Sequence, residues 1–314
     1  ADLMQIPVIT TMMGISVFPD DDQLFCGMIG THGVKMANAA VNECDVLFLV
    51  GARVGDRAVK TPLALEKTTK IIHIDIDPAE IGKNIGADLP LVGDAKLVLQ
   101  QMTELAKPMK HDGWIAHIKT LGGERKYVEP AKGTVNPRVF IDRLAKKMPA
   151  NVTVVADVGQ NQIWTCTEYK FRKEGRLLTS GGMGTMGYSV PAAIGAKMAD
   201  NSRATVAICG DGAFQMSFME LATAVQFGVD IKVVVMTNNR LGMVRELQTN
   251  GYHDRQTAVF LDGSPDFIKL AEAYGIPAMR VYDDDTMEKG VEMLAEHKGI
   301  CLVEVVVDKD MPTL

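Results

Sequence analysis

Short apolar runs alternate with amphipathic segments along the first third of the chain. The pattern predicts strands over residues 8–11, 46–50 and 71–76, and helices over 33–42 and 95–105. Apolar runs bounded by turn residues are typical of buried strands, and apolar spacings of three to four residues are typical of helices. This order of strands and helices indicates a parallel sheet covered by helices, which is a doubly wound α/β fold.

The same alternation resumes after residue 137 and continues almost to the end. It predicts helices over 137–147, 187–198, 219–227, 265–274 and 286–297, and strands over 153–157, 204–209, 232–237, 279–281 and 301–307. Between the two regions, residues 108–136 have weak periodicity and contain several glycines, which favours a linker. We therefore expect two doubly wound parallel-sheet domains, over 1–107 and 137–314.

The chain opens on residues 6–11, which already have the pattern of a buried strand. Terminal residues of a domain are usually poorly ordered, so a domain rarely opens inside its sheet. We expect the first domain to be incomplete at its N-terminus. No basic segment followed by an apolar one precedes the strand, so the sequence shows no signal peptide.

Composition and charge exclude several classes of protein. The 314 residues are 47% hydrophobic and 23% charged, which is globular rather than disordered usage. A net charge of -6 does not favour nucleic acid as a partner. No apolar run approaches the roughly 18 residues that a membrane span requires. Five cysteines without a C-x-x-C pair favour free thiols in a reducing compartment, so we expect a cytoplasmic protein.

A polar cluster follows each of two consecutive predicted strands in the second domain. Gly210, Asp211 and Gly212 follow one strand, and Asn238 and Asn239 follow the next. Ligands of open α/β sheets bind at this edge. The glycines let the backbone approach a phosphate, and the side-chain oxygens of Asp211 and Asn238 suit Mg²⁺. Either motif alone is a common turn, but their separation by one helix and one strand favours a metal–diphosphate site.

These motifs and their spacing resemble the signature of the thiamine diphosphate (ThDP) enzymes, and within them the catalytic subunit of acetohydroxyacid (acetolactate) synthases. The resemblance covers nearly the whole chain. It implies a middle domain followed by a diphosphate-binding domain. It is carried by residues 73–84, 180–187, 191–195, 210–216, 220–224 and 238–245.

The resemblance implies a set of metal and cofactor contacts in the second domain. Asp211, Asn238 and the carbonyl of Arg240 correspond to the family's Mg²⁺ ligands. Met186, with Gly184 in the same turn, corresponds to the wedge between the two rings of ThDP, although a methionine in such a turn also suits plain core packing. The other implied ThDP contacts are Gly159, Gln160, Asn161, Gly210, Gly212, Ala213 and Met243, and the family usually has His where Asn161 stands.

The first domain contains a weaker nucleotide-binding pattern. The strand over 46–50 runs into Gly51 and Gly55, and Asp75 follows at about the distance at which an acid meets a ribose hydroxyl. A structural turn fits this pattern almost as well. The resemblance adds FAD as a candidate cofactor with a structural role, although residues 53–57 depart at two of five positions from the family's Arg-Phe-Asp-Asp-Arg. The implied FAD residues are Met12, Met13, Gly30, His32, Gly51, Arg53, Asp75, Ile76 and Asp94.

The activity that the resemblance implies is decarboxylation of pyruvate and condensation with a second 2-keto acid to 2-acetolactate, in branched-chain amino-acid biosynthesis. Implied partners are a second copy, as homodimer or tetramer, and a regulatory small subunit. Family members carry a further N-terminal pyrimidine-binding domain with an essential glutamate, so we expect residues 1–314 alone to form negligible acetolactate. Leu247 stands where family members that prefer 2-ketobutyrate as acceptor have Trp.

Other functions remain open at this stage. Sister carboligases, such as glyoxylate carboligase or a catabolic acetolactate synthase, share the motifs. A non-catalytic nucleotide-binding module explains Gly51 and Asp75 but leaves Asp211 and Asn238 without a purpose. A haloacid-dehalogenase phosphotransferase fits the D-x-D at Asp75, but Pro78 stands where that class expects Thr or Val.

Overall fold

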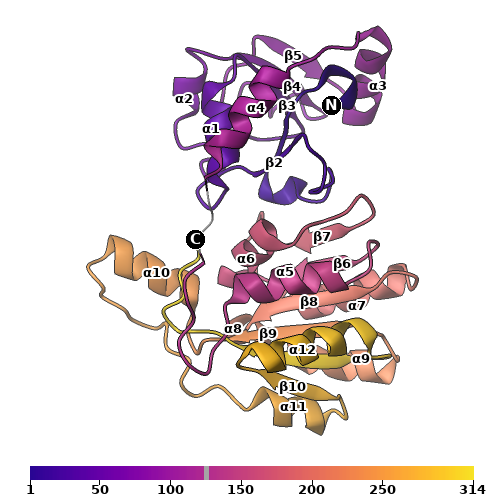
Figure 1. Ribbon diagram of the computed structural model, residues 1–314, viewed down its shortest axis with the longest axis vertical. Helices are drawn as coiled ribbons and strands as arrows, with labels where there is room; N and C mark the ends of the chain where they lie inside the picture. The colour runs from indigo at the N-terminus through magenta and orange to yellow at the C-terminus, as the bar shows by residue number, and fades with distance from the viewer. Residues whose placement is uncertain (124–126) are drawn as a thin grey trace. The chain divides into compact units, whose positions relative to one another are not determined.

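The computed structural model describes residues 1–123 and 127–314 of the chain (Figure 1). It divides into two compact units, the first formed by residues 1–14 and 22–125 and the second by residues 15–21 and 126–314. Every pair of adjacent strands in the sheets is parallel. The predicted α/β class is therefore confirmed. None of the helices in the described ranges is long and apolar enough to cross a membrane.

The first unit has two small parallel sheets, with strand orders β1-β2 and β3-β4-β5. The strands β3 and β4 pair from Val46 opposite Lys70 to Val50 opposite Ile74. Its elements are η1 (Asp2–Met4), β1 (Val8–Thr10), η2 (Met12–Gly14), β2 (Phe25–Met28), α1 (Lys35–Glu43), β3 (Val46–Val50), α2 (Pro62–Leu65), β4 (Lys70–Asp75), β5 (Leu89–Val92), α3 (Ala95–Leu105) and α4 (Asp112–Leu121).

Helix α4 lies inside the segment that the sequence pattern assigns to a linker. Trp114 and Ile118, one helical turn apart, face one side of α4 and pack in a cluster with Cys26 and Ala40. Helix α4 contacts α1, so residues 112–121 are part of the first unit. A helix with so short an apolar face gives a weak periodic signal, which explains why the pattern favours a linker there.

The second unit contains one six-stranded sheet of order β10-β11-β9-β8-β6-β7. Its elements are α5 (Pro137–Lys147), β6 (Thr153–Ala156), α6 (Gln160–Glu168), β7 (Arg176–Thr179), α7 (Ser189–Ala199), β8 (Thr205–Gly210), α8 (Asp211–Phe214), η3 (Phe218–Glu220), α9 (Leu221–Gln226), β9 (Lys232–Thr237), α10 (Gly242–Gly251), α11 (Phe267–Ala273), β10 (Ala278–Val281), α12 (Asp284–Glu296) and β11 (Cys301–Val306).

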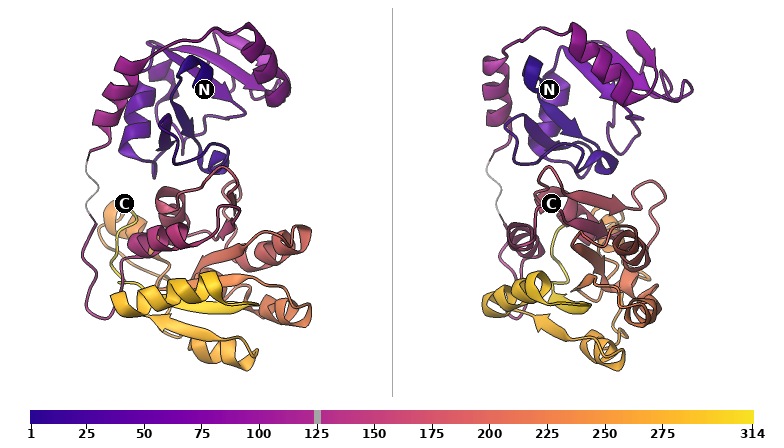
Figure 2. Two further views of the ribbon diagram at one scale, coloured as in Figure 1. Left: turned by 45° about the vertical axis from the view of Figure 1, so that its right-hand side comes forward. Right: turned by 90° about the vertical axis from the view of Figure 1, so that its right-hand side faces the viewer.

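Helices cover both faces of the six-stranded sheet. Helix α5 contacts α6 and α12 on one face, and α7, α9 and α11 pack against the other (Figures 1 and 2). All six residues of β9 are buried, which is expected for a central strand covered on both sides. In the core on the α7 face the rings of Phe214 and Phe267 meet edge to face, with their centroids 5.4 Å apart.

The order of the strands creates a switch point between β6 and β8. From β6 the chain crosses to β7 at one edge of the sheet, whereas from β8 it proceeds the other way to β9. The segments that leave the carboxyl ends of β6 and β8 therefore diverge, because they cover opposite faces. Open α/β sheets bind ligands in the crevice that such a divergence leaves.

The helical glycines Gly290, which is buried, and Gly195, which is exposed, provide a matched test of the packing of α12 against the sheet. A Cβ on Gly290 in α12 would lie 2.6 Å from Val281 Cγ2, whereas a Cβ on Gly195 in α7 meets nothing within 4 Å. Overpacking costs about 1–3 kcal/mol, more than the roughly 1 kcal/mol that alanine adds to a helix. We expect Gly290→Ala to lower, and Gly195→Ala to raise, the free energy of unfolding measured in urea. Equal effects of the two substitutions would contradict this packing.

Candidate functional site

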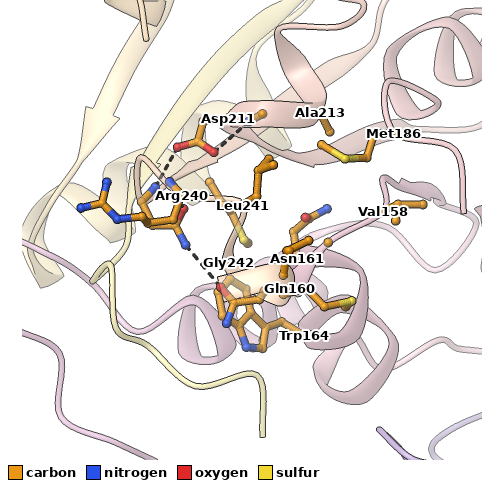
Figure 3. A pocket seen from close by; sticks show the side chains of 17 residues that line it. Val158, Gln160, Asn161, Trp164, Met186, Asp211, Ala213, Arg240, Leu241 and Gly242 are labelled. Atoms are coloured by element: carbon orange, nitrogen blue, oxygen red, sulfur yellow. Dashed lines mark hydrogen bonds between the residues drawn. The ribbon is translucent and has the colours of Figure 1, made fainter. Parts of the chain in front are cut away.

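A pocket lies at the carboxyl ends of β6, β8 and β9, at the switch point of the second unit (Figure 3). Its walls come from three chain segments that follow these strands, together with Met186. In Figure 3 the labelled side chains of Asn161, Met186 and Leu241 converge on the cavity. The lining residues are Val158, Gly159, Gln160, Asn161, Trp164, Met186, Gly210, Asp211, Gly212, Ala213, Met236, Asn238, Arg240, Leu241, Gly242, Met243 and Val244.

Asp211 is a buried acid on the pocket wall, with 2% of its surface exposed. Its Oδ1 accepts a hydrogen bond from the Gly212 N–H at 2.8 Å, and its Oδ2 accepts from the N–H groups of Asn238 and Asn239 at 3.1 and 2.6 Å. Burial raises the pKa of Asp211 to about 6, although these N–H groups oppose the shift. No ion pair joins Asp211 to a basic side chain within residues 1–123 and 127–314, and such a buried carboxylate is a suitable ligand for a divalent cation.

Asn238 and Arg240 lie beside Asp211 and can complete a set of hard oxygen ligands. Asn238 Oδ1 accepts from the Arg240 N–H at 3.0 Å, and Asn239 between them has a left-handed φ of 53° that makes the turn tight. The Arg240 side chain bonds to Asp262 at 2.8 Å and lies over the Phe260 ring, 4.6 Å from its centroid. The guanidinium is therefore engaged elsewhere, and the backbone carbonyl is the group that can bind a metal.

Gly159 and Gly212 stand at the pocket where the backbone has no space for a side chain. Gly159 has a φ of +146°, which strains any other residue. A Cβ on Gly212 would lie 2.7 Å from Leu241 Cδ2 and 3.4 Å from Met186 Cε. Helix α6 begins directly after Gly159, so its first backbone N–H groups are available to an anion. The donors fit a diphosphate, and the oxygens of Asp211 and Asn238 fit Mg²⁺.

Asn161 connects the two strands that diverge at the pocket. Its Nδ2 donates to the Asp157 carbonyl at the end of β6, at 2.8 Å, and to the Ile208 carbonyl in β8, at 3.2 Å. Its Oδ1 lies next to Gly159 and Gly210, 3.3 Å from the position of a Cβ on Gly210. The amide thus holds the strand ends together and presents an oxygen, not a positive charge, near the predicted diphosphate loop.

Asp157 holds the turn that carries Met186. Its side chain is fully buried and accepts from the N–H groups of Val158 at 2.9 Å, Gly187 at 3.0 Å and Ser189 at 2.8 Å. The sequence pattern predicts Asp157 as the last residue of a strand and indicates no role for it in the site. An acid at the carboxyl end of a buried strand was the available signal.

The structure brings most of the predicted second-domain residues together. Eleven of the thirteen line the pocket, and the exceptions are Gly184 and Leu247. Leu247 is 59% exposed and lies on α10 one turn beyond Val244, which does line the pocket. The sequence analysis missed Val158, Trp164, Met236, Leu241, Gly242 and Val244.

The residues predicted to bind FAD are spread over two sheets of the first unit. Gly51, Asp75, Ile76 and Asp94 follow the carboxyl ends of β3, β4 and β5, so they share one sheet edge. Asp75 accepts from the Asp77 N–H at 2.9 Å. Asp94 caps α3 through the Leu97 N–H at 3.1 Å, a structural role. The others follow β1 (Met12, Met13), β2 (Gly30, His32) or β3 (Arg53).

Comparison with protein families gives two matches. Residues 157–305 match the C-terminal TPP binding domain of thiamine pyrophosphate enzymes, and residues 1–102 match the central domain of the same enzymes. The first match contains every pocket residue, and the second contains β1 to β5.

Similar curated proteins are named acetolactate synthases. A probable acetolactate synthase large subunit of Methanocaldococcus jannaschii is 40% identical over 98% of this chain and 54% of its own length. The large subunit of Lactococcus lactis is 36% identical over 97% of this chain and 53% of its own. The large subunit of acetolactate synthase isozyme 3 of Escherichia coli K12 is 34% identical over 98% of this chain and 55% of its own length. The chain spans about half the length of the curated relatives it matches.

The three hydrogen bonds to Asp157 generate a prediction about the Met186 turn. In Asp157→Asn one oxygen is replaced by an NH₂ group that faces N–H donors. A buried polar group left unsatisfied costs about 1–3 kcal/mol, so we expect a loss of stability in urea and faster amide exchange over residues 183–189. The control is Asp142→Asn, which removes only the surface ion pair with Lys146 and should cost about 0.5 kcal/mol. Unchanged exchange over 183–189 would refute the assignment.

Proposed function

The chain belongs to the thiamine pyrophosphate enzymes, and we propose that the pocket of its second unit binds ThDP with Mg²⁺ as part of an acetolactate synthase. The single observation that carries the proposal is the pairing of Asp211 and Asn238 at adjacent strand ends, in one pocket with Gly159, whose φ of +146° favours glycine. Oxygen ligands for a metal and a glycine turn at a helix N-terminus therefore occur in one pocket.

The chain's own residues bind and orient the cofactor in this proposal. Asp211, Asn238 and the Arg240 carbonyl hold Mg²⁺, which neutralises the diphosphate charge. The α6 N-terminus and Gly212 accommodate the diphosphate, and Met186, held by Asp157, supports the bend of the cofactor. Bound ThDP supplies the nucleophilic carbon and stabilises the carbanion.

The reaction we propose joins two pyruvate molecules into one 2-acetolactate with release of one CO₂, or uses a second 2-keto acid as the acceptor. Its support is the name shared by the similar proteins and the chemistry of the residues that line the pocket. Apolar side chains of Met186, Leu241, Met243 and Val244 line the pocket and exclude water from the reacting carbon. The product enters branched-chain amino-acid biosynthesis.

Membership of the thiamine pyrophosphate enzymes also supports proposals for a second cofactor, for partner chains and for the location of the protein. We assign a structural FAD to the edge formed by Gly51, Asp75 and Asp94, and a second copy and a regulatory small subunit as partners. The word "subunit" in the names of the relatives supports a multi-chain assembly. The five cysteines are free thiols, which is typical of a reducing compartment and supports a cytoplasmic location.

Removing the Asp211 carboxylate tests the metal assignment. We expect Asp211→Ala to abolish Mg²⁺-dependent ThDP binding, because the mutant loses the charged ligand, while the far-ultraviolet circular dichroism stays unchanged. Calorimetric titration with ThDP, with Mg²⁺ or with EDTA, measures this. The control, Asp262→Ala, removes a neighbouring exposed acid that pairs with Arg240 and should bind normally. If Asp211→Ala binds ThDP with undiminished affinity in the presence of Mg²⁺, Asp211 is not a ligand of the metal.

Leu247 tests acceptor preference. Trp has a larger apolar face than Leu at position 247, which lies one turn beyond Val244. The larger face would add contact with the extra methylene of 2-ketobutyrate, and such a contact is worth about 1–3 kcal/mol. We therefore expect the enzyme that contains this chain to discriminate little or to favour pyruvate, and Leu247→Trp to shift it toward 2-ketobutyrate. Competition between the two keto acids at equal concentration measures the preference. A strong 2-ketobutyrate preference with Leu247 in place would contradict the assignment.

A further inference from the structure

The amide of Gln160 is fixed in one orientation by three acceptors. Gln160 is 4% exposed, and its Nε2 lies 2.9 Å from the Met311 carbonyl, 3.2 Å from Thr313 Oγ1 and 3.3 Å from Glu246 Oε2. A carbonyl and a carboxylate cannot donate hydrogen bonds, so the NH₂ group must face them. Gln160 Oε1 therefore faces the other way, toward the pocket.

The orientation of Gln160 determines that of Asn238. Gln160 Oε1 accepts from Asn238 Nδ2 at 3.3 Å (dashed line in Figure 3). A flipped Asn238 would place two amide oxygens against each other. The contact therefore directs Asn238 Oδ1 away from Gln160, where it accepts from the Arg240 N–H at 3.0 Å. This is the oxygen that the proposed function gives to Mg²⁺.

Two of the three acceptors around Gln160, those of Met311 and Thr313, belong to the segment of residues 311–313, which is anchored in turn. Thr313 N–H donates to Glu246 at 3.2 Å, and the Thr313 hydroxyl donates to the same carboxylate. Trp164 Nε1 donates to the Pro312 carbonyl at 3.2 Å. Met311 and Thr313 are 3% and 2% exposed. Residues 311–313 are thus bound to α6 and α10, the helices that carry Gln160 and Glu246.

Gly242 leaves space for the Gln160–Asn238 contact. A Cβ at this position would lie 1.9 Å from Gln160 Oε1 and 3.1 Å from Asn238 Nδ2. Any side chain there would displace the Gln160 amide. The bare α-carbon is a second feature, independent of the hydrogen bonds, that keeps the two amides together.

From this arrangement we propose that Gln160 is a positioning residue for Mg²⁺: Glu246 and Thr313 orient its amide, and the amide in turn presents Asn238 Oδ1 to the metal. The inference rests on the proposed function. It couples the docking of residues 311–313 to metal affinity, since losing the acceptors around Gln160 Nε2 frees the Gln160 amide to flip and leaves only the Arg240 N–H to orient Asn238.

The first experiment measures Mg²⁺ binding at saturating ThDP by calorimetry. Gln160→Met keeps the length and removes both hydrogen-bonding groups, and Thr313→Val removes one acceptor of Nε2. We expect the Kd for Mg²⁺ to rise at least tenfold in Gln160→Met, which loses the hydrogen bonds of both amide groups, and about threefold in Thr313→Val, which removes one acceptor of Nε2. The matched control is Gln162→Met on the same helix, whose buried amide bonds to Thr179 away from the pocket; it should leave the Kd unchanged.

A donor–acceptor exchange separates orientation from stability. Gln160→Glu alone sets two carboxylates against each other and should weaken Mg²⁺ binding. Adding Glu246→Gln restores one donor between these positions and keeps an acceptor toward Asn238, so we expect the Kd for Mg²⁺ to recover in part, although an oxygen still faces the Met311 carbonyl. A purely structural role would restore the urea midpoint in the double variant and leave the Kd at its weakened value.

The outcomes distinguish the two proposals. If the unmodified chain shows no Mg²⁺-dependent ThDP binding, the proposed function fails. If the unmodified chain binds and both Gln160→Met and Thr313→Val retain its Kd, the function stands and the positioning role of Gln160 is wrong. An equal loss of Mg²⁺ affinity in Gln162→Met would also overturn the positioning role of Gln160, because removing any buried amide of α6 would then have the same effect.

Discussion

The parallel register of β6, β8 and β9 is the constraint on which the site depends. Ala156 pairs opposite Ile208 and Gly210 opposite Met236, so all three strands end at one edge of the sheet. Backbone hydrogen bonds set this alignment, and a shift of one residue would turn every buried side chain to the other face. Because the strands on the two sides of the switch point lead to opposite faces, their ends remain uncovered and available to a ligand.

Two buried aspartates at this edge have different tasks because their surroundings differ. Asp157 directs its carboxylate to N–H groups of the turn that carries Met186, so it maintains the shape of the pocket. Asp211 faces the pocket, and burial raises its pKa to about 6. A cation close to Asp211 would favour the ionised form and compensate the cost of burying it. Shape and charge at the site thus come from separate residues of the same type.

Much of the site was predictable from residues close in sequence to strand ends. Gly210, Asp211, Gly212 and Asn238 carry their chemistry in a local motif, and the alternation of elements places them at one edge. Trp164 and Gly242 were not predictable in this way, since a tryptophan in an apolar helix and a glycine before a helix have common structural roles. The same holds for α4, whose short apolar face resembles a linker.

The sequence by itself determined the α/β class and the two regions of alternating elements, and it indicated the residue types proposed for metal and diphosphate binding, because apolar periodicity and short motifs are local properties. Only the tertiary structure decided which amide atom of Asn238 faces the proposed metal position. Gln160 receives its orientation from Glu246 and Thr313, 86 and 153 residues further along the chain. A hydrogen-bond direction depends on all the donors and acceptors packed around a group, and these come together only when the chain is folded.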